Sequence, residues 1–90
     1  MSLSGQNALV VGGGTGMGEA IALGLAAEGA TVAVAGRRQE KLDAVTAQAQ
    51  GVLTHTVDVG DRPSVRALFD WAAETFGGRL DLLVNCAGVN

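Results

Sequence analysis

The 90-residue sequence contains no tyrosine, one cysteine and one histidine. A single cysteine permits no disulfide within the chain, which is typical of proteins in a reducing compartment. One histidine, one cysteine and scattered carboxylates give no spacing typical of a metal site. Cys86 has no histidine or cation beside it in the sequence, and His55 is isolated, so we interpret both as packing or surface residues. The sequence therefore predicts no metal site and no catalytic residue of its own.

Positive charge and long hydrophobic runs are also scarce. Six Lys and Arg residues stand against nine Asp and Glu residues, for a net charge of -3 at pH 7. Binding a polyanion over a large surface requires a basic stripe, and the sequence has none. No apolar run reaches the roughly 18 residues of a membrane helix, and residues 1–6 do not resemble a signal peptide. We therefore expect a soluble cytoplasmic protein that binds neither nucleic acid nor membranes.

Short apolar runs alternate with longer helical patterns along the chain. We predict strands over residues 8–11, 31–35, 52–58 and 82–85, separated by helices over 16–28, 39–49 and 62–76. The third run mixes polar and apolar residues, which favours a strand near a sheet edge, whereas the other three are apolar throughout, as buried parallel strands are. The expected fold is α/β, a Rossmann-type doubly wound parallel sheet with strand order 3-2-1-4 and three helices.

Apolar side chains at helical spacing predict which face of each helix packs on the sheet. The third helix has the clearest start, because Asp61 can cap it and Pro63 fits its first turn. Gly29, Gly51 and Gly77 follow the helices as stop signals. The expected inward residues are Met17, Ala20, Ile21 and Leu25 in the first helix, Leu42, Val45 and Ala49 in the second, and Val65, Leu68, Phe69, Ala72 and Phe76 in the third.

A glycine-rich stretch, Gly-Gly-Gly-Thr-Gly-Met-Gly, occupies residues 12–18, where the first strand turns into the first helix. Backbone N–H groups and the positive end of a helix dipole stabilise phosphate charge there if no side chain blocks the approach. Gly12 is expected to make the turn, Gly16 to admit a diphosphate to the main chain, and Gly18 to let the helix pack closely. The alternative is a flexible turn without chemical role, but its place between strand and helix favours the nucleotide. The remaining candidate contacts are Gly14, the Thr15 hydroxyl and Met17.

With these motifs, the whole chain resembles the short-chain dehydrogenase/reductase family. Gly12, Gly16 and Gly18 match the glycines of that family's TGxxxGxG motif, although Val11 stands where the family has threonine. Residues 58–59, Asp-Val, look like its adenine-contacting dipeptide after the third strand. Residues 85–88, Asn-Cys-Ala-Gly, look like its NNAG motif after the fourth strand, with Cys86 replacing an asparagine. The resemblance implies an NAD(P) site at the carboxyl end of the sheet.

The resemblance assigns cofactor contacts outside the glycine loop, and each has a structural alternative. Asp58 and Val59 are expected beside the adenine, although Asp58 alternatively caps the turn that follows its strand. Asn85, Ala87 and Gly88 are expected to bring main-chain groups beside the cofactor, with Asn85 alternatively serving only to stabilise the backbone.

The residues after the second strand predict which dinucleotide is bound. Proteins selective for NAD carry an acidic residue there that binds the adenosine ribose, but this chain has Gly36 followed by Arg37 and Arg38. A guanidinium near that ribose suits a 2′-phosphate, with charge-assisted hydrogen bonds worth about 1.5 to 3 kcal/mol. The alternative is that both arginines belong to a solvated surface. We expect NADP(H) to be favoured over NAD(H).

The resemblance implies hydride transfer between an alcohol and a carbonyl, which the family performs with Ser, Tyr and Lys and a supporting Asn. No tyrosine is present, the only lysine is Lys41 on the second helix, and Ser64 begins a distant helix. We therefore interpret residues 1–90 as a partial NAD(P)-binding Rossmann domain whose catalytic half is absent. The alternatives are a stand-alone, non-catalytic nucleotide-binding or interaction module, or a site for another ligand such as S-adenosylmethionine.

The fourth strand, residues 82–85, has an outer edge that no predicted strand covers. An exposed apolar edge is a site for pairing with another chain. We expect self-association through this edge, or a homo-oligomer in the complete protein.

Overall fold

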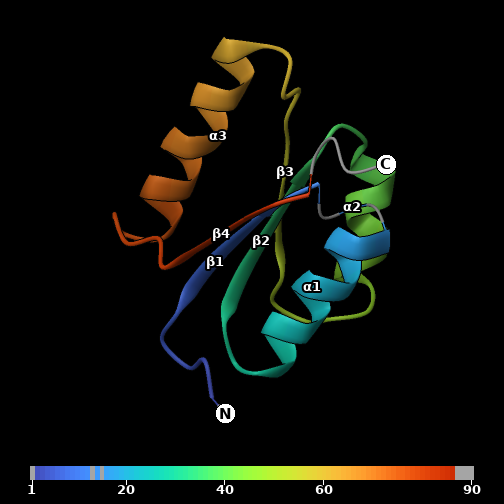
Figure 1. Cartoon of the computed structure of the whole chain (residues 1–90), viewed down its shortest axis with the longest axis vertical. Coiled ribbons are helices and arrows are strands. Elements are labelled where there is room, and N and C mark those ends of the chain that lie inside the picture. Colours follow the sequence, from blue (N-terminus) through green and yellow to red (C-terminus); the bar gives the residue numbers. More distant parts are fainter. Residues whose placement is uncertain (1, 13, 15, 87–90) are drawn as a thin grey trace.

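Four parallel strands form one sheet with helices on both of its faces (Figure 1). The computed structural model describes residues 2–12, 14 and 16–86. The strand order is β3-β2-β1-β4, as predicted from the sequence, and β3 is an edge strand. The elements in chain order are β1 (Asn7–Val11), α1 (Gly16–Ala27), β2 (Thr31–Gly36), α2 (Gln39–Thr46), β3 (Leu53–Thr56), α3 (Arg62–Thr75) and β4 (Leu82–Asn85).

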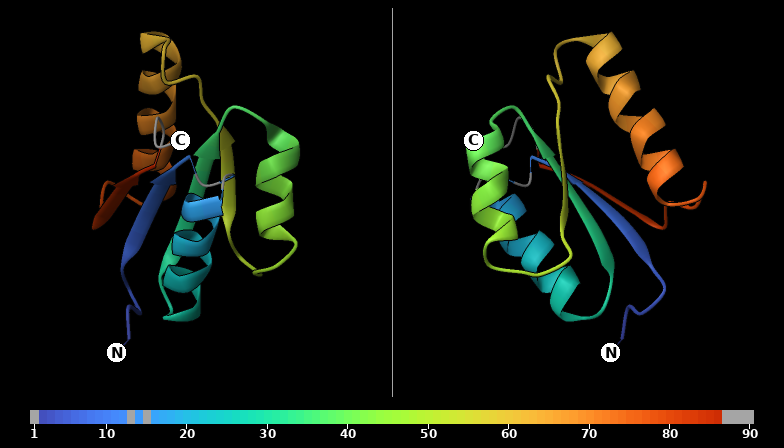
Figure 2. Two further views of the ribbon diagram at one scale, coloured as in Figure 1. Left: turned by 45° about the vertical axis from the view of Figure 1, so that its right-hand side comes forward. Right: turned by 180° about the vertical axis from the view of Figure 1, so that it is seen from behind.

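The core lies in two layers, one on each face of the sheet. Figure 2 shows α1 and α2 on one face and α3 on the other. Because successive strand residues point to opposite faces, β1 and β2 supply apolar side chains to both layers. The first layer contains Ala8, Val10, Ala22, Val32, Val34, Leu42, Val45 and Val52. The second contains Leu9, Val11, Ala33, Ala35, Val57, Leu68, Ala72 and Phe76.

The predicted face of α1 is partly wrong. Gly18 and Ala22, four residues apart, are its buried residues, whereas Met17 is 59% exposed and Ala20 is also exposed. Ile21 and Leu25 pack against the core as predicted. Small residues along the contact line let the helix axis approach the sheet closely, and apolar periodicity alone does not reveal such a line.

The start and inward face of α3 also differ from the prediction in two details. Leu68, Ala72 and Phe76 form the buried line, but Phe69 is 37% exposed because it lies one residue, or about 100°, away from that line. Asp61 occupies the N-cap position, yet its side chain makes no capping hydrogen bond.

Two elements are shorter than predicted by more than one residue. β3 ends at Thr56 rather than at residue 58, because the Val57 N–H makes the last bond to β2, at 2.8 Å from the Gly36 oxygen, before the chain turns. α2 ends at Thr46 rather than at residue 49, because the Gln48 N–H bonds to Val45 and tightens the last turn. The predicted stop residues Gly29, Gly51 and Gly77 all have positive φ, at 96°, 85° and 64°.

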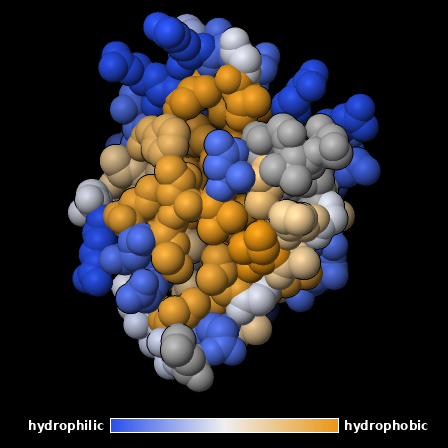
Figure 3. All heavy atoms as spheres, viewed as in Figure 1, coloured by the Kyte–Doolittle hydropathy of each residue, from blue (hydrophilic) through white to orange (hydrophobic). Residues whose placement is uncertain are grey.

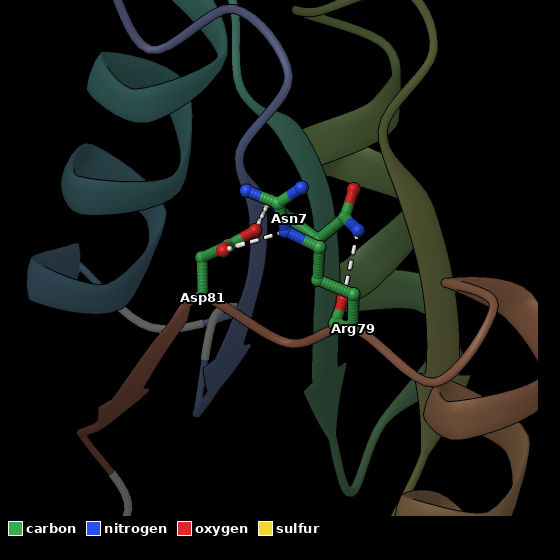
Figure 4. A network of polar contacts seen from close by, with 3 residues as sticks. All are labelled: Asn7, Arg79 and Asp81. Carbon is green, nitrogen blue, oxygen red and sulfur yellow. Dashed lines mark hydrogen bonds and ion pairs between the residues drawn. The ribbon is translucent and has the colours of Figure 1, made fainter.

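A polar network joins the beginnings of β1 and β4 (Figure 4). The Asn7 backbone N–H donates to Asp81 Oδ2 at 2.8 Å, and Asn7 Nδ2 donates to the Arg79 carbonyl oxygen at 2.8 Å. Arg79 Nε donates to Asp81 Oδ1 at 3.0 Å. The Asn7 N–H and, second, the Arg79 side chain lower the pKa of Asp81 from its usual value. The network anchors the start of β4 beside β1.

Apolar side chains cover the surface at the β4 edge. Figure 3 shows them spread across the face on which β4 lies, between α3 and α1. Leu83 is 53% exposed there, and its β4 neighbours Leu82 and Val84 are half-buried. Among residues 2–12, 14 and 16–86, no helix is long and apolar enough to cross a membrane.

Candidate nucleotide site

The carboxyl ends of the strands meet at one edge of the sheet, where open α/β folds bind their ligands. Gly12 follows β1, Arg37 follows β2, Asp58 lies just after β3, and Asn85 ends β4. Parallel pairing places Val11 beside both Ala35 and Asn85, so these ends are level across the sheet. The fold thus brings the predicted site segments to the same edge.

Gly12 makes the turn out of β1 that the sequence predicts. Its φ is +86°, a conformation that favours glycine. Its backbone N–H donates to the Ala35 oxygen at 2.6 Å, which continues the pairing with β2. Because that amide is engaged in the sheet, amides that could bind phosphate lie further along the loop.

The next loop residues differ in their surroundings. A β-carbon built on Gly14 comes within 2.9 Å of Lys41 Cβ and 3.6 Å of Leu42 Cδ2, so this part of the loop lies against α2. A β-carbon built on Gly16 meets nothing within 4 Å. Sequence reasoning assigned both glycines to the cofactor, but the structure shows a packing reason for Gly14. Thr15 lies outside the described residues.

An open pocket of about 330 Å³ lies beside the ends of β2 and β3. It brings together the predicted residues Arg37 and Asp58, which are 21 positions apart in the sequence. Arg38 is exposed at the N-cap of α2 and does not line the pocket. The other lining residues are Thr56, Val57 and Ser64, which sequence reasoning did not assign to the site.

The glycine that ends β2 lies against a buried leucine of α2. A β-carbon on Gly36 comes within 3.4 Å of Leu42 Cδ2, and Leu42 is fully buried. This is an ordinary van der Waals contact with the end of a flexible side chain, so a larger residue fits there by a small shift of Leu42. The strand nevertheless ends without an acidic side chain. Arg37 then presents the first charged side chain after the strand, on the rim of the pocket.

Asp58 makes the turn contacts that its structural alternative predicts. The Gly60 N–H donates to Asp58 Oδ1 at 3.0 Å, and the Asp61 N–H donates to the Asp58 carbonyl oxygen at 3.0 Å. The Asp58 N–H in turn donates to Ser64 Oγ at 2.9 Å. Asp58 itself and Val59 are exposed, Val59 by 52%. A contact of either residue with adenine stays a prediction.

The end of β4 lies beside the glycine turn. Asn85 is exposed and pairs with Val11, and the Cys86 N–H donates to the Val11 oxygen at 2.8 Å. The Cys86 side chain is buried, and Ala87 and Gly88 lie outside the described residues.

His55, the only histidine of the sequence, packs against an aromatic residue of α3. Its ring lies 4.9 Å from that of Trp71 between centroids. Within residues 2–12, 14 and 16–86, no three metal-ligating side chains gather in one place.

Comparison with known proteins decides the family. The family model described as short chain dehydrogenase matches residues 6–90. The chain belongs to this family. Its sheet order and helices are those of the Rossmann fold of short-chain dehydrogenases, as the resemblance implied.

The relatives of this short-chain dehydrogenase chain are oxidoreductases. An uncharacterized oxidoreductase of Staphylococcus aureus strain USA300 is 44% identical over 88 residues, covering 96% of this chain and 38% of the relative. A dehydrogenase/reductase structure from Sinorhizobium meliloti 1021 superposes with a TM-score of 0.87 at 40% identity, covering 97% of this chain and 36% of that one. The 3-ketoacyl-(acyl-carrier-protein) reductase of Brucella melitensis, solved with NADH, superposes with a TM-score of 0.84 at 31% identity, covering 91% and 34%. The chain thus spans less than two fifths of the length of each of these proteins.

Proposed function

We propose that this chain is the NADP(H)-binding part of an oxidoreductase that interconverts an alcohol and a carbonyl. The pocket that joins Arg37 to Asp58 at the carboxyl edge of the sheet carries the proposal. The names of the relatives as oxidoreductases and reductases support the reaction class. When bound, the cofactor would donate a hydride to the carbonyl or accept one from the alcohol. Residues that transfer the proton lie outside residues 1–90, which form a partial domain.

The chain's own residues bind and orient the two halves of the cofactor. Gly12 shapes the turn, and the open main chain at Gly16 receives the diphosphate at the start of α1. The burial of Gly18 supports its role in holding α1 close to the sheet. The remaining contacts proposed for the cofactor are Gly14, Thr15, Met17, Arg38, Val59, Asn85, Ala87 and Gly88.

The preference for NADP(H) follows from the charges at the adenosine end. Gly36 carries no acid that would repel a 2′-phosphate, and Arg37 lies on the pocket rim. A planar guanidinium donates paired hydrogen bonds to phosphate oxygens. One solved relative binds NADH, so the choice between cofactors is proposed to rest on Arg37 rather than on the fold.

Titration of the natural gene product with NADPH and NADH tests this function. We expect NADPH to bind at least several-fold more tightly, and Arg37→Asp to abolish that preference by reversing the charge on the pocket rim. Arg66→Asp, an equal charge change on the exposed part of α3, is the control and keeps the preference. Equal wild-type affinities would refute the selectivity, and absence of binding to both nucleotides would refute the function.

The apolar β4 edge supports a second proposal, that the 90-residue polypeptide by itself pairs with a second copy. Among the described residues β4 pairs only with β1, so its outer side offers a row of backbone groups next to the exposed Leu83. In the complete protein we propose a homo-oligomer.

We also propose that the protein acts in the cytoplasm. Its one cysteine is a buried free thiol, which is typical of proteins kept in a reducing compartment. Fractionation of cells with an antibody against the gene product tests the location.

A further inference from the structure

The turn after β3 is held by hydrogen bonds of two kinds. Asp58 accepts from Gly60 through its side chain and from Asp61 through its carbonyl oxygen, and both bonds stay within the turn. The bond from the Asp58 N–H to Ser64 Oγ, 2.9 Å long, instead joins the turn to α3. The first two bonds fix the shape of the turn up to Asp61, the N-cap residue of α3, and the third adds a side-chain hydrogen bond between the turn and the first helical turn.

Ser64 is well placed to hold the turn. It lies in the first turn of α3, a helix that is anchored on the sheet by Leu68 and Ala72, with exposures of 1% and 2%. Ser64 is itself half-buried and lines the same pocket as Arg37 and Asp58. A hydroxyl has two acceptor positions and one donor hydrogen, so accepting from Asp58 leaves its hydrogen available to other groups.

We infer that Ser64 is a positioning residue of the nucleotide site, which orients Asp58 toward the adenosine half of the cofactor. This inference rests on the proposed function. Without the hydroxyl, the turn keeps its bond to Asp61, the N-cap residue of α3, but loses its hydrogen bond to the first helical turn, so Asp58 and Val59 are held less firmly relative to Arg37. Ser64 acts through Asp58 and takes no part in hydride transfer.

Three variants of the natural gene product test the inference. Ser64→Ala removes the hydroxyl, Ser64→Thr retains it, and Thr75→Ala removes an exposed hydroxyl from the other end of α3 as a control. Affinities for NADPH and for 2′,5′-ADP are measured by titration calorimetry, and stability by thermal unfolding. We expect Ser64→Ala to weaken both ligands by about threefold to tenfold, the factor that one ordinary hydrogen bond carries. Ser64→Thr and Thr75→Ala stay within about twofold of wild type.

The outcomes separate a positioning role from a structural one. If Ser64→Ala lowers the melting temperature but leaves both affinities unchanged, the inference is overturned. It is also overturned if Ser64→Thr weakens binding as much as Ser64→Ala does. If the wild-type protein binds neither ligand, the proposed function fails and the inference falls with it, whereas normal wild-type binding with an unaffected Ser64→Ala overturns the inference alone.

Discussion

The two glycines at positions 14 and 16 are predicted to respond in opposite ways to the same substitution. In Gly14→Ala the new methyl group lies 2.9 Å from Lys41 Cβ. Carbon atoms prefer about 3.5 to 4.0 Å, so the loop and α2 must separate by up to about 1 Å. Lys41 Cβ is attached directly to the helix backbone and cannot move aside as the end of a flexible side chain can.

The magnitude for Gly14→Ala follows from overpacking. A methyl group inserted into a tight contact costs about 1 to 3 kcal/mol. Replacing glycine by alanine also restricts the unfolded chain, which offsets about 0.4 to 1 kcal/mol of that loss. We expect a net loss of about 1 to 2 kcal/mol, and each kcal/mol lowers the melting temperature of a domain of this size by about 4 to 8 °C.

Gly16→Ala is the matched comparison, because its methyl group meets nothing within 4 Å. The protein is expected to be as stable as wild type or more stable by up to about 1 kcal/mol. The same methyl group stands where the diphosphate is proposed to approach the main chain, so affinity for NADPH falls by about tenfold or more, the effect of losing a hydrogen bond to a charged group.

Thermal unfolding and NADPH titration of both variants check the pair. A Gly14→Ala protein with wild-type stability would show that the loop does not press against α2. A Gly16→Ala protein with wild-type affinity would refute the place assigned to the diphosphate.

Two further predictions concern β4 and the residue that precedes it. Leu83→Lys puts a charge on the exposed apolar edge and is expected to shift the 90-residue polypeptide toward monomer in sedimentation velocity. Leu80→Lys, outside the strand, is the control. An unchanged distribution of species in Leu83→Lys would show that the copies do not associate through this edge. Asp81 has a lowered pKa in the folded protein, so its stabilising contribution is present above its unfolded value of 3.8 and is lost as the pH falls through the folded value. The free energy of unfolding in urea is therefore expected to be higher for wild type than for Asp81→Asn at pH 7, and the two values are expected to converge in acid. A difference that does not change with pH would contradict a stabilising role of the Asp81 carboxylate.

The sequence predicted the order of elements and the sheet topology well, because buried parallel strands and their crossovers leave a strong pattern of apolar residues. It was less accurate on helix faces. Met17 was expected inside and is exposed, since the contact line of α1 follows the small residues Gly18 and Ala22. The end of β3 was also misplaced, because residues 57 and 58 continue the alternating pattern although the hydrogen bonding to β2 has ended at Val57.

By itself the sequence determined the α/β class, the strand order, the family and the edge of the sheet at which the proposed site residues gather, because these depend on local periodicity and on motifs contiguous in the chain. Only the tertiary structure revealed that Arg37, Asp58 and Ser64 line one pocket. It also showed that Gly14 packs against α2 and that the Gly12 N–H is hydrogen-bonded within the sheet. These features depend on distances between segments far apart in the sequence, which no local pattern specifies.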